Sequence, residues 1–412
     1  MFSSCPATIL DLHGDGTMTQ TATPMTQTAT PHTSPREIAS YFDGLDDPRS
    51  AVNRRYTLSN VLAIAIMAIL AGAKGPTGIA RWARLKEAFL GTCLDLPDSA
   101  PRKDVFRTVL SRLRPQAFQA CFAHWLASLQ QDAQAAKEIT QPILAVDGKT
   151  NRRSHDGTKG LGALHAVTIW ASELGLSLAQ VACAEKSNEI TAIPEALQLV
   201  DIRGAIITID AMGTQKEIAR QIIDQEADYV FALKGNHETL HNEVVDYIDQ
   251  HLDNDFADVN ARRHTESEIS HGREESRVYI QFPVPAAVTQ KAEWKGLQTI
   301  GMATRCYTKN GEDYSEVRYY LSSLPLGVKN FARAVRQHWG VENGCHWVLD
   351  MTFREDESRI RGPQIRENVA WLNRLALSLL KQHPEKNSIA MKRQTCAWDD
   401  DYMLQVLTGI IP

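Results

Sequence analysis

Hydrophobic residues recur at helical spacing from Ile38 to about residue 135. Apolar positions three and four apart predict a series of helices, with polar faces between them. The predicted helices span 61–73, 79–85, 105–113 and 118–129. The first of these is a 13-residue apolar run, too short to cross a bilayer, and is typical of a buried helix that Ser59 or Asn60 could cap. We therefore expect an all-helical N-terminal domain over 36–135.

The pattern changes to short β-branched runs after residue 139. Two runs end on acids: 143–146 is followed by Asp147, and 206–209 is followed by Asp210. The full order is strands at 143–146, 163–170 and 176–182, a helix at 190–199, a strand at 206–209, a helix at 218–223 and a strand at 229–233. Strand–helix–strand units favour a parallel pair buried on both faces, so the fold class is α/β with a mixed sheet.

Residues of about 240–325 have a different character. After a short helix comes a polar stretch over 262–273, interpreted as a connection, and then strand-like runs at 276–282, 299–308 and 317–321. These runs predict a β-rich insertion. Long helical patterns at 331–349 and 365–380 follow it, and residues 381–412 are expected to be a C-terminal tail that is weakly structured apart from 402–407. The second domain would therefore span 140–380.

The first 35 residues are polar and of low complexity. The heptapeptide MTQTATP occurs twice in tandem, at 18–24 and 25–31. So few apolar side chains cannot offset the entropy of ordering the chain, so a disordered tail is expected.

Composition excludes few classes of protein or partner. The net charge of −5 argues mildly against nucleic acid as a partner, although local basic patches matter more than the sum. The seven scattered cysteines favour free thiols in a reducing cytoplasm. No secretion signal or membrane span is apparent, so a cytoplasmic protein is expected.

The chemistry most strongly indicated is that of the two strand-end acids. If their strands are adjacent and parallel, Asp147 and Asp210 lie side by side at one edge of the sheet. With an acid from the helical stretch at 331–360, they could hold two divalent ions. Mg²⁺ prefers such oxygen ligands, and a pair of ions about 3.5–4 Å apart can activate a nucleophile and stabilise a departing 3′ oxygen.

Two competing motifs are weaker. Gly148-Lys149-Thr150 ends like a phosphate-binding loop, but Ile143 stands where that loop needs a glycine. The stretch from His237 to His241 matches H-E-x-x-H, the motif of zinc hydrolases, but no third ligand follows at a telling spacing.

Long blocks of this sequence resemble the ISAs1-type (H-repeat-associated) transposases of the IS4-like superfamily. The blocks are AVDGKT at 145–150, IDAMGTQKEIARQIIDQEADYVFALKGN at 209–236 and RQHWGVENGCHWVLDMTFREDESRIR at 336–361, with GIARWA and DVFRTVLSRLRPQAF in the helical region. The resemblance covers about 36–380. It implies an RNase H-like DDE catalytic core with a catalytic and metal-binding triad of Asp147, Asp210 and Glu342, using Mg²⁺, for which Mn²⁺ may substitute.

The third acid is the least certain member of the triad. IS4-like relatives have Tyr-x2-Arg-x3-Glu-x6-Lys around it, whereas this chain has Val335, His338 and Leu349 at the flanking positions. Glu342 is preferred because it lies within the helical stretch with polar residues one turn away. The alternatives are Asp350, Glu355, Asp356 and Glu357.

Basic residues near the triad are candidates for contacts with DNA phosphates, with a solvated surface as the alternative. They are Lys149, Arg152, Arg153, Lys234, Arg336, Arg359 and Arg361. Trp339 and Trp347 could stack on a flipped base, although burial in a helical core is the favoured interpretation.

The predicted function is that of a bacterial insertion-sequence transposase. It would cleave double-stranded DNA at transposon ends and transfer the freed 3′ end to target DNA, as a homodimer or higher multimer at the nucleoid. The alternative is a catalytically inactive DNA-binding relic, which the missing signature Lys favours. A zinc hydrolase using His237 and His241 is a distant third.

Overall fold

The computed structural model describes residues 34–52, 54–97, 99–183, 189–270, 273–309 and 312–409. The expected disordered tail lies outside the described residues apart from its last two, which begin the first helix. Ser34 caps α1 (Pro35–Ser40) by accepting a hydrogen bond from the Glu37 amide.

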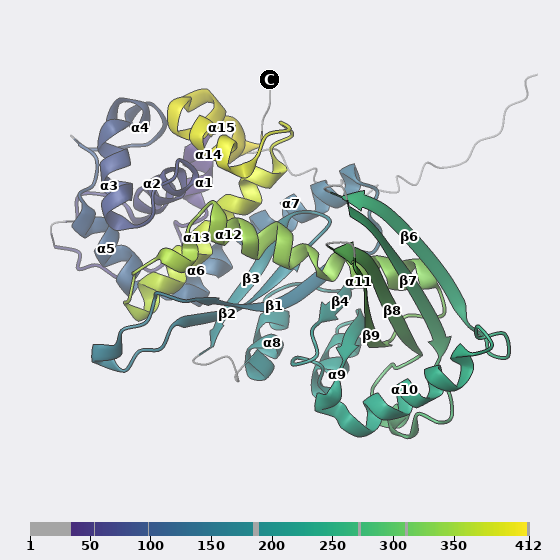
Figure 1. The fold of residues 1–412 in the computed structure, drawn as a ribbon. Coiled ribbons are helices and arrows are strands. Elements are labelled where there is room, and N and C mark those ends of the chain that lie inside the picture. Colours follow the sequence, from purple (N-terminus) through teal and green to yellow (C-terminus); the bar gives the residue numbers. More distant parts are fainter. Residues whose placement is uncertain are drawn as a thin grey trace, which may run out of the picture. The chain divides into compact units, whose positions relative to one another are not determined.

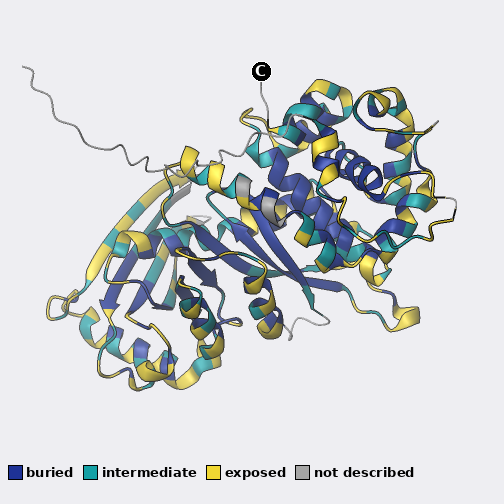
Figure 2. Ribbon diagram, turned by 180° about the vertical axis from the view of Figure 1, so that it is seen from behind, coloured by how far each residue is buried: buried dark blue, intermediate teal, exposed yellow. Residues whose placement is uncertain are grey.

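The helical pattern of the N-terminal part is present as a bundle around one long buried helix. The helices are α1, α2 (Leu58–Leu70), α3 (Pro76–Leu85), α4 (Glu87–Cys93), α5 (Lys103–Arg112), α6 (Pro115–Cys121) and α7 (Ala123–Ala136). All of α2 is buried (Figure 2). Its cap is Thr57 rather than Ser59 or Asn60, because Thr57 is the extended residue whose side chain accepts from the Asn60 amide.

The described strands form a single mixed sheet in the order β3-β2-β1-β4-β5-β9-β8-β7-β6 (Figure 1). Its strands are β1 (Ile143–Asn151), β2 (Leu164–Ala171), β3 (Leu176–Cys183), β4 (Ile206–Ile209), β5 (Asp228–Leu233), β6 (Arg262–Ser270), β7 (Arg273–Pro283), β8 (Thr299–Lys309) and β9 (Glu312–Ser322). β1, β4 and β5 run parallel, and the remaining pairs are antiparallel. The mixed α/β fold expected from the sequence is confirmed.

The two faces of the sheet carry different helices. On β1, Leu144 and Val146 belong to a core shared with α8 (Glu189–Gln198), α9 (Lys216–Asp224) and α10 (Glu238–Leu252). The alternate residue Ile143 faces a second core with α11 (Val328–His338). A strand alternates its side chains between faces, so Asp147 and Asp210 lie on the α11 face, in phase with Ile143 and with Ile206 on β4.

The strand-rich insertion is continuous with the central sheet. β9 pairs with β5, so β6–β9 extend the sheet that carries β1 and β4. The polar stretch interpreted as a connection is wrong in part, because residues 262–270 form β6. This strand lies at the edge of the sheet, where its polar side chains remain in solvent and no apolar alternation is required.

Two further expectations need correction. β1 does not end at Asp147 but continues to Asn151, because its antiparallel pairing with β2 extends beyond the end of β4. The expected C-terminal tail is wrong for its described part before residue 400, because α14 (Ile389–Trp398) forms there. α15 (Asp400–Thr408) contains the structured exception expected at 402–407, and both helices pack into the helical core.

The helical stretch after the insertion is interrupted. α11 is followed by a π-helical turn, Glu342–His346, and then by α12 (Trp347–Met351). Next, α13 (Pro363–Gln382) contacts β3 as well as α2 and α5, which ties the sheet to the helical bundle. Among the described helices, none is both long and apolar enough to span a membrane.

Candidate active site

The two aspartates come from neighbouring parallel strands. The last registered pair of β1 and β4 is Val146 with Ile209, so Asp147 and Asp210 are the next residues on both strands. Both line one cavity of about 230 Å³ beneath α11. The prediction that their strands are adjacent and parallel is therefore confirmed, although only Asp210 follows the end of its strand.

Local hydrogen bonds orient both carboxylates. The Gly148 amide donates to Oδ1 of Asp147 over 2.9 Å, and the amides of Met212 and Gly213 donate to Oδ1 of Asp210 over 3.1 and 3.2 Å. A side chain at Gly213 would approach Ile193 to 2.6 Å, so glycine permits the tight turn that presents Asp210. The DAMG sequence, residues 210–213, thus forms a turn that orients the Asp210 carboxylate.

Glu342 lies close to Asp147 in the same cavity. It begins the π-helical turn, is exposed, and lines the same cavity as Asp147 and Asp210. Asp147, Glu342 and His346 each offer one ligand atom within 4.8 Å of the others. Asp210 lies outside this tighter group, so the structure brings the predicted triad to one cavity but joins His346 to two of its members.

The electrostatics of the cavity favour a bound cation. Burial and the negative charges of Glu342 and Asp210 together raise the pKa of Asp147 to about 7, against the opposing hydrogen bond from Gly148. The acids are thus close enough to repel one another, and divalent ions would relieve that repulsion. Carboxylate oxygens are the donors that Mg²⁺ prefers, so the three acids fit the expected ion.

The two histidines near the acids are held in the neutral form. Burial lowers the pKa of His338 to about 4 despite the nearby Asp210. Burial also lowers the pKa of His346 to about 3, helped by the positive charges of Arg374 and Lys149. Neither ring neutralises the acids at physiological pH.

The alternative third acids have basic partners elsewhere. Asp350 and Asp356 lie 2.7 and 3.4 Å from Nζ of Lys149. Glu355 is buried, and its Oε1 lies 3.2 Å from the Arg374 guanidinium. Glu357 pairs with Arg354. This geometry favours Glu342, whose role as third acid stays a prediction.

The predicted DNA contacts fall into distinct environments. Lys149 is buried and paired with the acids just described, so a phosphate would have to displace them. Arg152 pairs with Asp356 at 3.2 Å, while Arg336 pairs with Glu268 at 3.2 Å. The remaining four are exposed: Arg153, Lys234, Arg359 and Arg361. Lys234 also lines the cavity of the acids.

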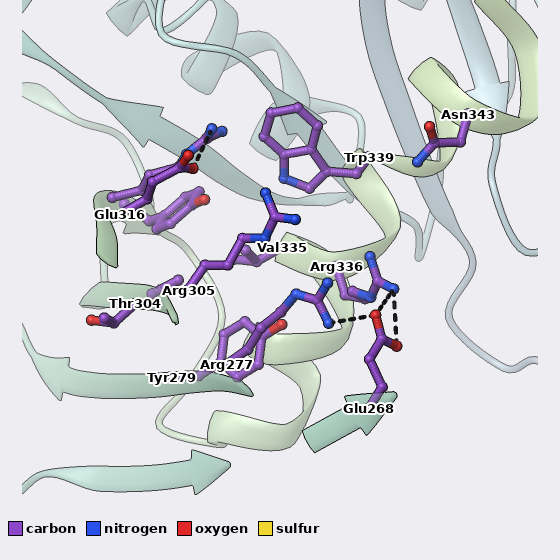
Figure 3. Close-up of a pocket in the computed structure, with 13 residues that line it drawn as sticks. Glu268, Arg277, Tyr279, Thr304, Arg305, Glu316, Val335, Arg336, Trp339 and Asn343 are labelled. Atoms are coloured by element: carbon purple, nitrogen blue, oxygen red, sulfur yellow. Dashed lines mark hydrogen bonds and ion pairs between the residues drawn. The ribbon is translucent and has the colours of Figure 1, made fainter. Parts of the chain in front are cut away.

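An arginine-lined pocket of about 430 Å³ adjoins this cavity (Figure 3). Arg277, Arg305 and Arg318 reach it from β7, β8 and β9, and Arg336 reaches it from α11. The first three were not predicted. They could be recognised only once the register was known, which pairs Arg277 directly with Arg305.

Trp339 lines both the cavity of the acids and the arginine-lined pocket. The centre of its indole ring lies 4.3 Å from the Arg318 guanidinium. The favoured interpretation of both tryptophans as core residues is wrong. Trp347 is 60% exposed because it faces away from the packed side of α12, and Trp339 is only half-buried.

The competing motifs do not form sites. His237 precedes α10 and lies 2.6 Å from the Thr214 carbonyl oxygen, whereas His241 packs edge-on against Tyr319. Neither belongs to the metal-capable group found in the described part of the chain. Gly148-Lys149-Thr150 lies within β1 and is not a loop.

Comparison with known proteins gives consistent matches. One family model, DDE_Tnp_1-associated, matches residues 39–126, and another, the transposase DDE domain, matches residues 138–379. The chain is 36% identical to "Putative transposase YncI" of Escherichia coli O157:H7, over 91% of this chain and 95% of that protein. It is 34% identical to "H repeat-associated putative transposase YhhI" of Escherichia coli K12, over 91% of this chain and 98% of that protein. A solved piggyBac transposase synaptic complex with hairpin DNA aligns with 91% of this chain and 82% of its own, with a TM-score of 0.38 and 12% identity.

Proposed function

This chain belongs to the DDE transposase family, and from that premise we propose that it cleaves DNA at transposon ends and transfers the freed strand to target DNA. Asp147, Asp210 and Glu342 would hold the divalent ions. The observation that carries the proposal is the register of β1 and β4, which aligns two acids on the face that Glu342 approaches.

The chemistry expected of these residues is positioning and charge stabilisation. When bound, the ions would activate the attacking oxygen and stabilise the departing 3′ oxygen of the phosphodiester. The hydrogen bonds to Asp147 and Asp210 would keep both carboxylates oriented without further reorganisation. Lys234 and Arg318 line the same cavity and would hold the phosphate against the acids.

DNA is the partner that the arginine-lined pocket supports. Arg277, Arg305, Arg318 and Arg336 form a local basic surface in a chain whose net charge is −5. Planar guanidinium groups recognise phosphate oxygens in bidentate fashion. A DNA strand lying across this surface would reach the acids along the residues that line both the arginine-lined pocket and the cavity of the acids. Action on two transposon ends would require a homodimer or higher multimer.

The test is nicking of labelled transposon-end DNA by the full chain with Mg²⁺. We expect nicking by the wild type and its loss in Asp210→Asn and Glu342→Gln. Asp356→Asn should retain it, because Asp356 pairs with Lys149 and Arg152. Glu217→Gln, an exposed change on α9, is the matched control.

The outcomes separate the alternatives. Loss in Asp356→Asn with retention in Glu342→Gln would move the third acid to the 355–357 turn. No nicking by a wild-type protein that binds the DNA would instead favour the catalytically inactive relic, an alternative suggested by Leu349 in place of the signature Lys.

A further inference from the structure

His346 is a buried imidazole that lies beside the acids. Its relative exposure is 7%. Its Nδ1 lies 3.4 Å from Oδ2 of Asp147, whereas its Nε2 has no hydrogen-bond partner within the described residues. Nδ1 is therefore the ring nitrogen that could reach an ion held by the acids, and Nε2 would carry the ring proton.

The backbone conformation places the His346 ring close to Glu342, the proposed third acid. Glu342 and His346 are the first and last residues of the π-helical turn, and the Trp347 amide closes it onto the Glu342 carbonyl. Such wide turns are rare within helices and frequently occur at functional sites. The turn brings ligand atoms of Glu342 and His346 within 4.8 Å of each other and of Asp147.

Other histidines lie near the acids. His241 lines the cavity but packs edge-on against Tyr319, and two more have hydrogen-bond partners in the protein. Nδ1 of His338 lies 3.0 Å from the Thr208 hydroxyl. His165 lies 2.7 Å from Thr150 through Nδ1 and 2.5 Å from Glu189 through Nε2. Of His338, His165 and His346, only His346 belongs to a group in which the ligand atoms of two acids lie within 4.8 Å of a ring nitrogen.

We propose that His346 is a nitrogen ligand to the divalent ion held by Asp147 and Glu342. The proposal rests on the proposed function for those two acids and adds a ligand that the three carboxylates do not include. Ligands about 2.1 Å from a metal lie about 3.0–3.4 Å from their nearest neighbours, which agrees with the separation of Nδ1 and Oδ2.

A nitrogen donor changes which ions the site prefers. Mg²⁺ binds oxygen ligands, whereas imidazole suits transition-metal ions, whose affinities generally rise from Mn²⁺ to Cu²⁺. The ion at Asp147, Glu342 and His346 would therefore bind more tightly as Co²⁺ than as Mg²⁺. Asp210, outside this group, would contribute to a position that depends on oxygen ligands alone.

The test is binding of Co²⁺ to the metal-free full chain, measured by titration calorimetry and visible absorption. In His346→Ala, we expect the Co²⁺ affinity to fall roughly tenfold or more and the absorption spectrum to change, while the Mg²⁺ affinity changes by less than about threefold. His155→Ala, an exposed change, is the control. A Co²⁺ affinity and spectrum unchanged by His346→Ala would overturn the proposal.

A second measurement avoids reliance on a substitution that could disturb the buried turn. Proton NMR of the wild-type protein with Co²⁺ should show a strongly shifted histidine N–H signal that disappears in His346→Gln. Absence of that signal in the wild type would also overturn the proposal. If Co²⁺ binds through His346 but no DNA is nicked, the ligand assignment stands and the proposed function fails. If nicking occurs without a histidine signal, the proposed function stands and the ligand assignment fails.

Discussion

Asp147 shows how a carboxyl group buried among other acids lowers the stability of the folded protein. Its carboxyl is buried among other acids, and its pKa is raised to about 7. An unfolded Asp has a pKa near 3.9, so between about pH 4 and 7 the folded state holds a proton that the unfolded state releases. The free energy of unfolding therefore falls as pH rises through that window.

Asp147→Asn should remove this pH-dependent cost. We expect the metal-free variant to be more stable than the metal-free wild type at pH 8, by at most about 4 kcal/mol, with the difference smallest near pH 4. Urea unfolding in the presence of a chelator at several pH values measures it. Asp201→Asn, at an exposed position, should follow the wild type, and parallel profiles for Asp147→Asn and the wild type would contradict the assignment.

For individual residues, the sequence predicted the positions of the two aspartates but not the contacts made by the residues around them. Asp147 and Asp210 follow from the apolar runs that precede them. The burial of Lys149 does not, because its partner Asp356 is 207 positions away along the chain. The sequence placed His346 one turn from Glu342, but its proximity to Asp147 was not predictable, since it depends on the π-helical turn.

The elements that the sequence left undefined lack simple apolar periodicity. In α14, Lys392 and Arg393 are buried, and their charges are satisfied by carbonyl groups of other elements, including those of Leu380 and Ile69. Charged residues of this kind are typical of a solvated segment, so periodicity alone cannot reveal such a helix. The polar edge strand β6 was missed for a related reason.

Met403 tests whether the C-terminal helices belong to the core. It lies on α15 and is fully buried against the helical bundle. Met403→Ala should lower the free energy of unfolding by about 2–5 kcal/mol through lost burial and a residual cavity. Denaturant unfolding measures the loss. Met391→Ala on α14, at a position 42% exposed, is the matched control, and equal small effects would contradict the packing.

Across the whole molecule, the distribution of charge matters more than the total. The arginines of the pocket beside the acids have glutamate partners, such as Glu268 for Arg336 and Glu316 for Arg318. The pocket therefore gathers guanidinium groups and carboxylates on one surface of a chain whose net charge is −5. Sequence composition cannot show this, because it records the sum and not the surface.

Arg318→Gln should weaken DNA binding and its dependence on salt together. Losing one phosphate contact should reduce the slope of log affinity against log salt by about 1, with similar losses on unrelated sequences. Fluorescence anisotropy at several salt concentrations measures both quantities. Arg220→Gln, exposed on α9 and paired with Glu217, should leave the slope unchanged. An unchanged slope in Arg318→Gln would exclude that contact.

The pairing of β9 with β5 also determines which part of the sheet meets other molecules. Without β6–β9, the free edge would be β5, whose sequence DYVFAL is largely apolar. Such an edge readily recruits strands from neighbouring chains and leads to aggregation. The insertion moves the edge outward to β6, whose sequence RRHTESEIS discourages such recruitment by charge repulsion and hydration. The segment that carries three of the arginines beside the acids would thus also keep newly made copies of the protein from aggregating.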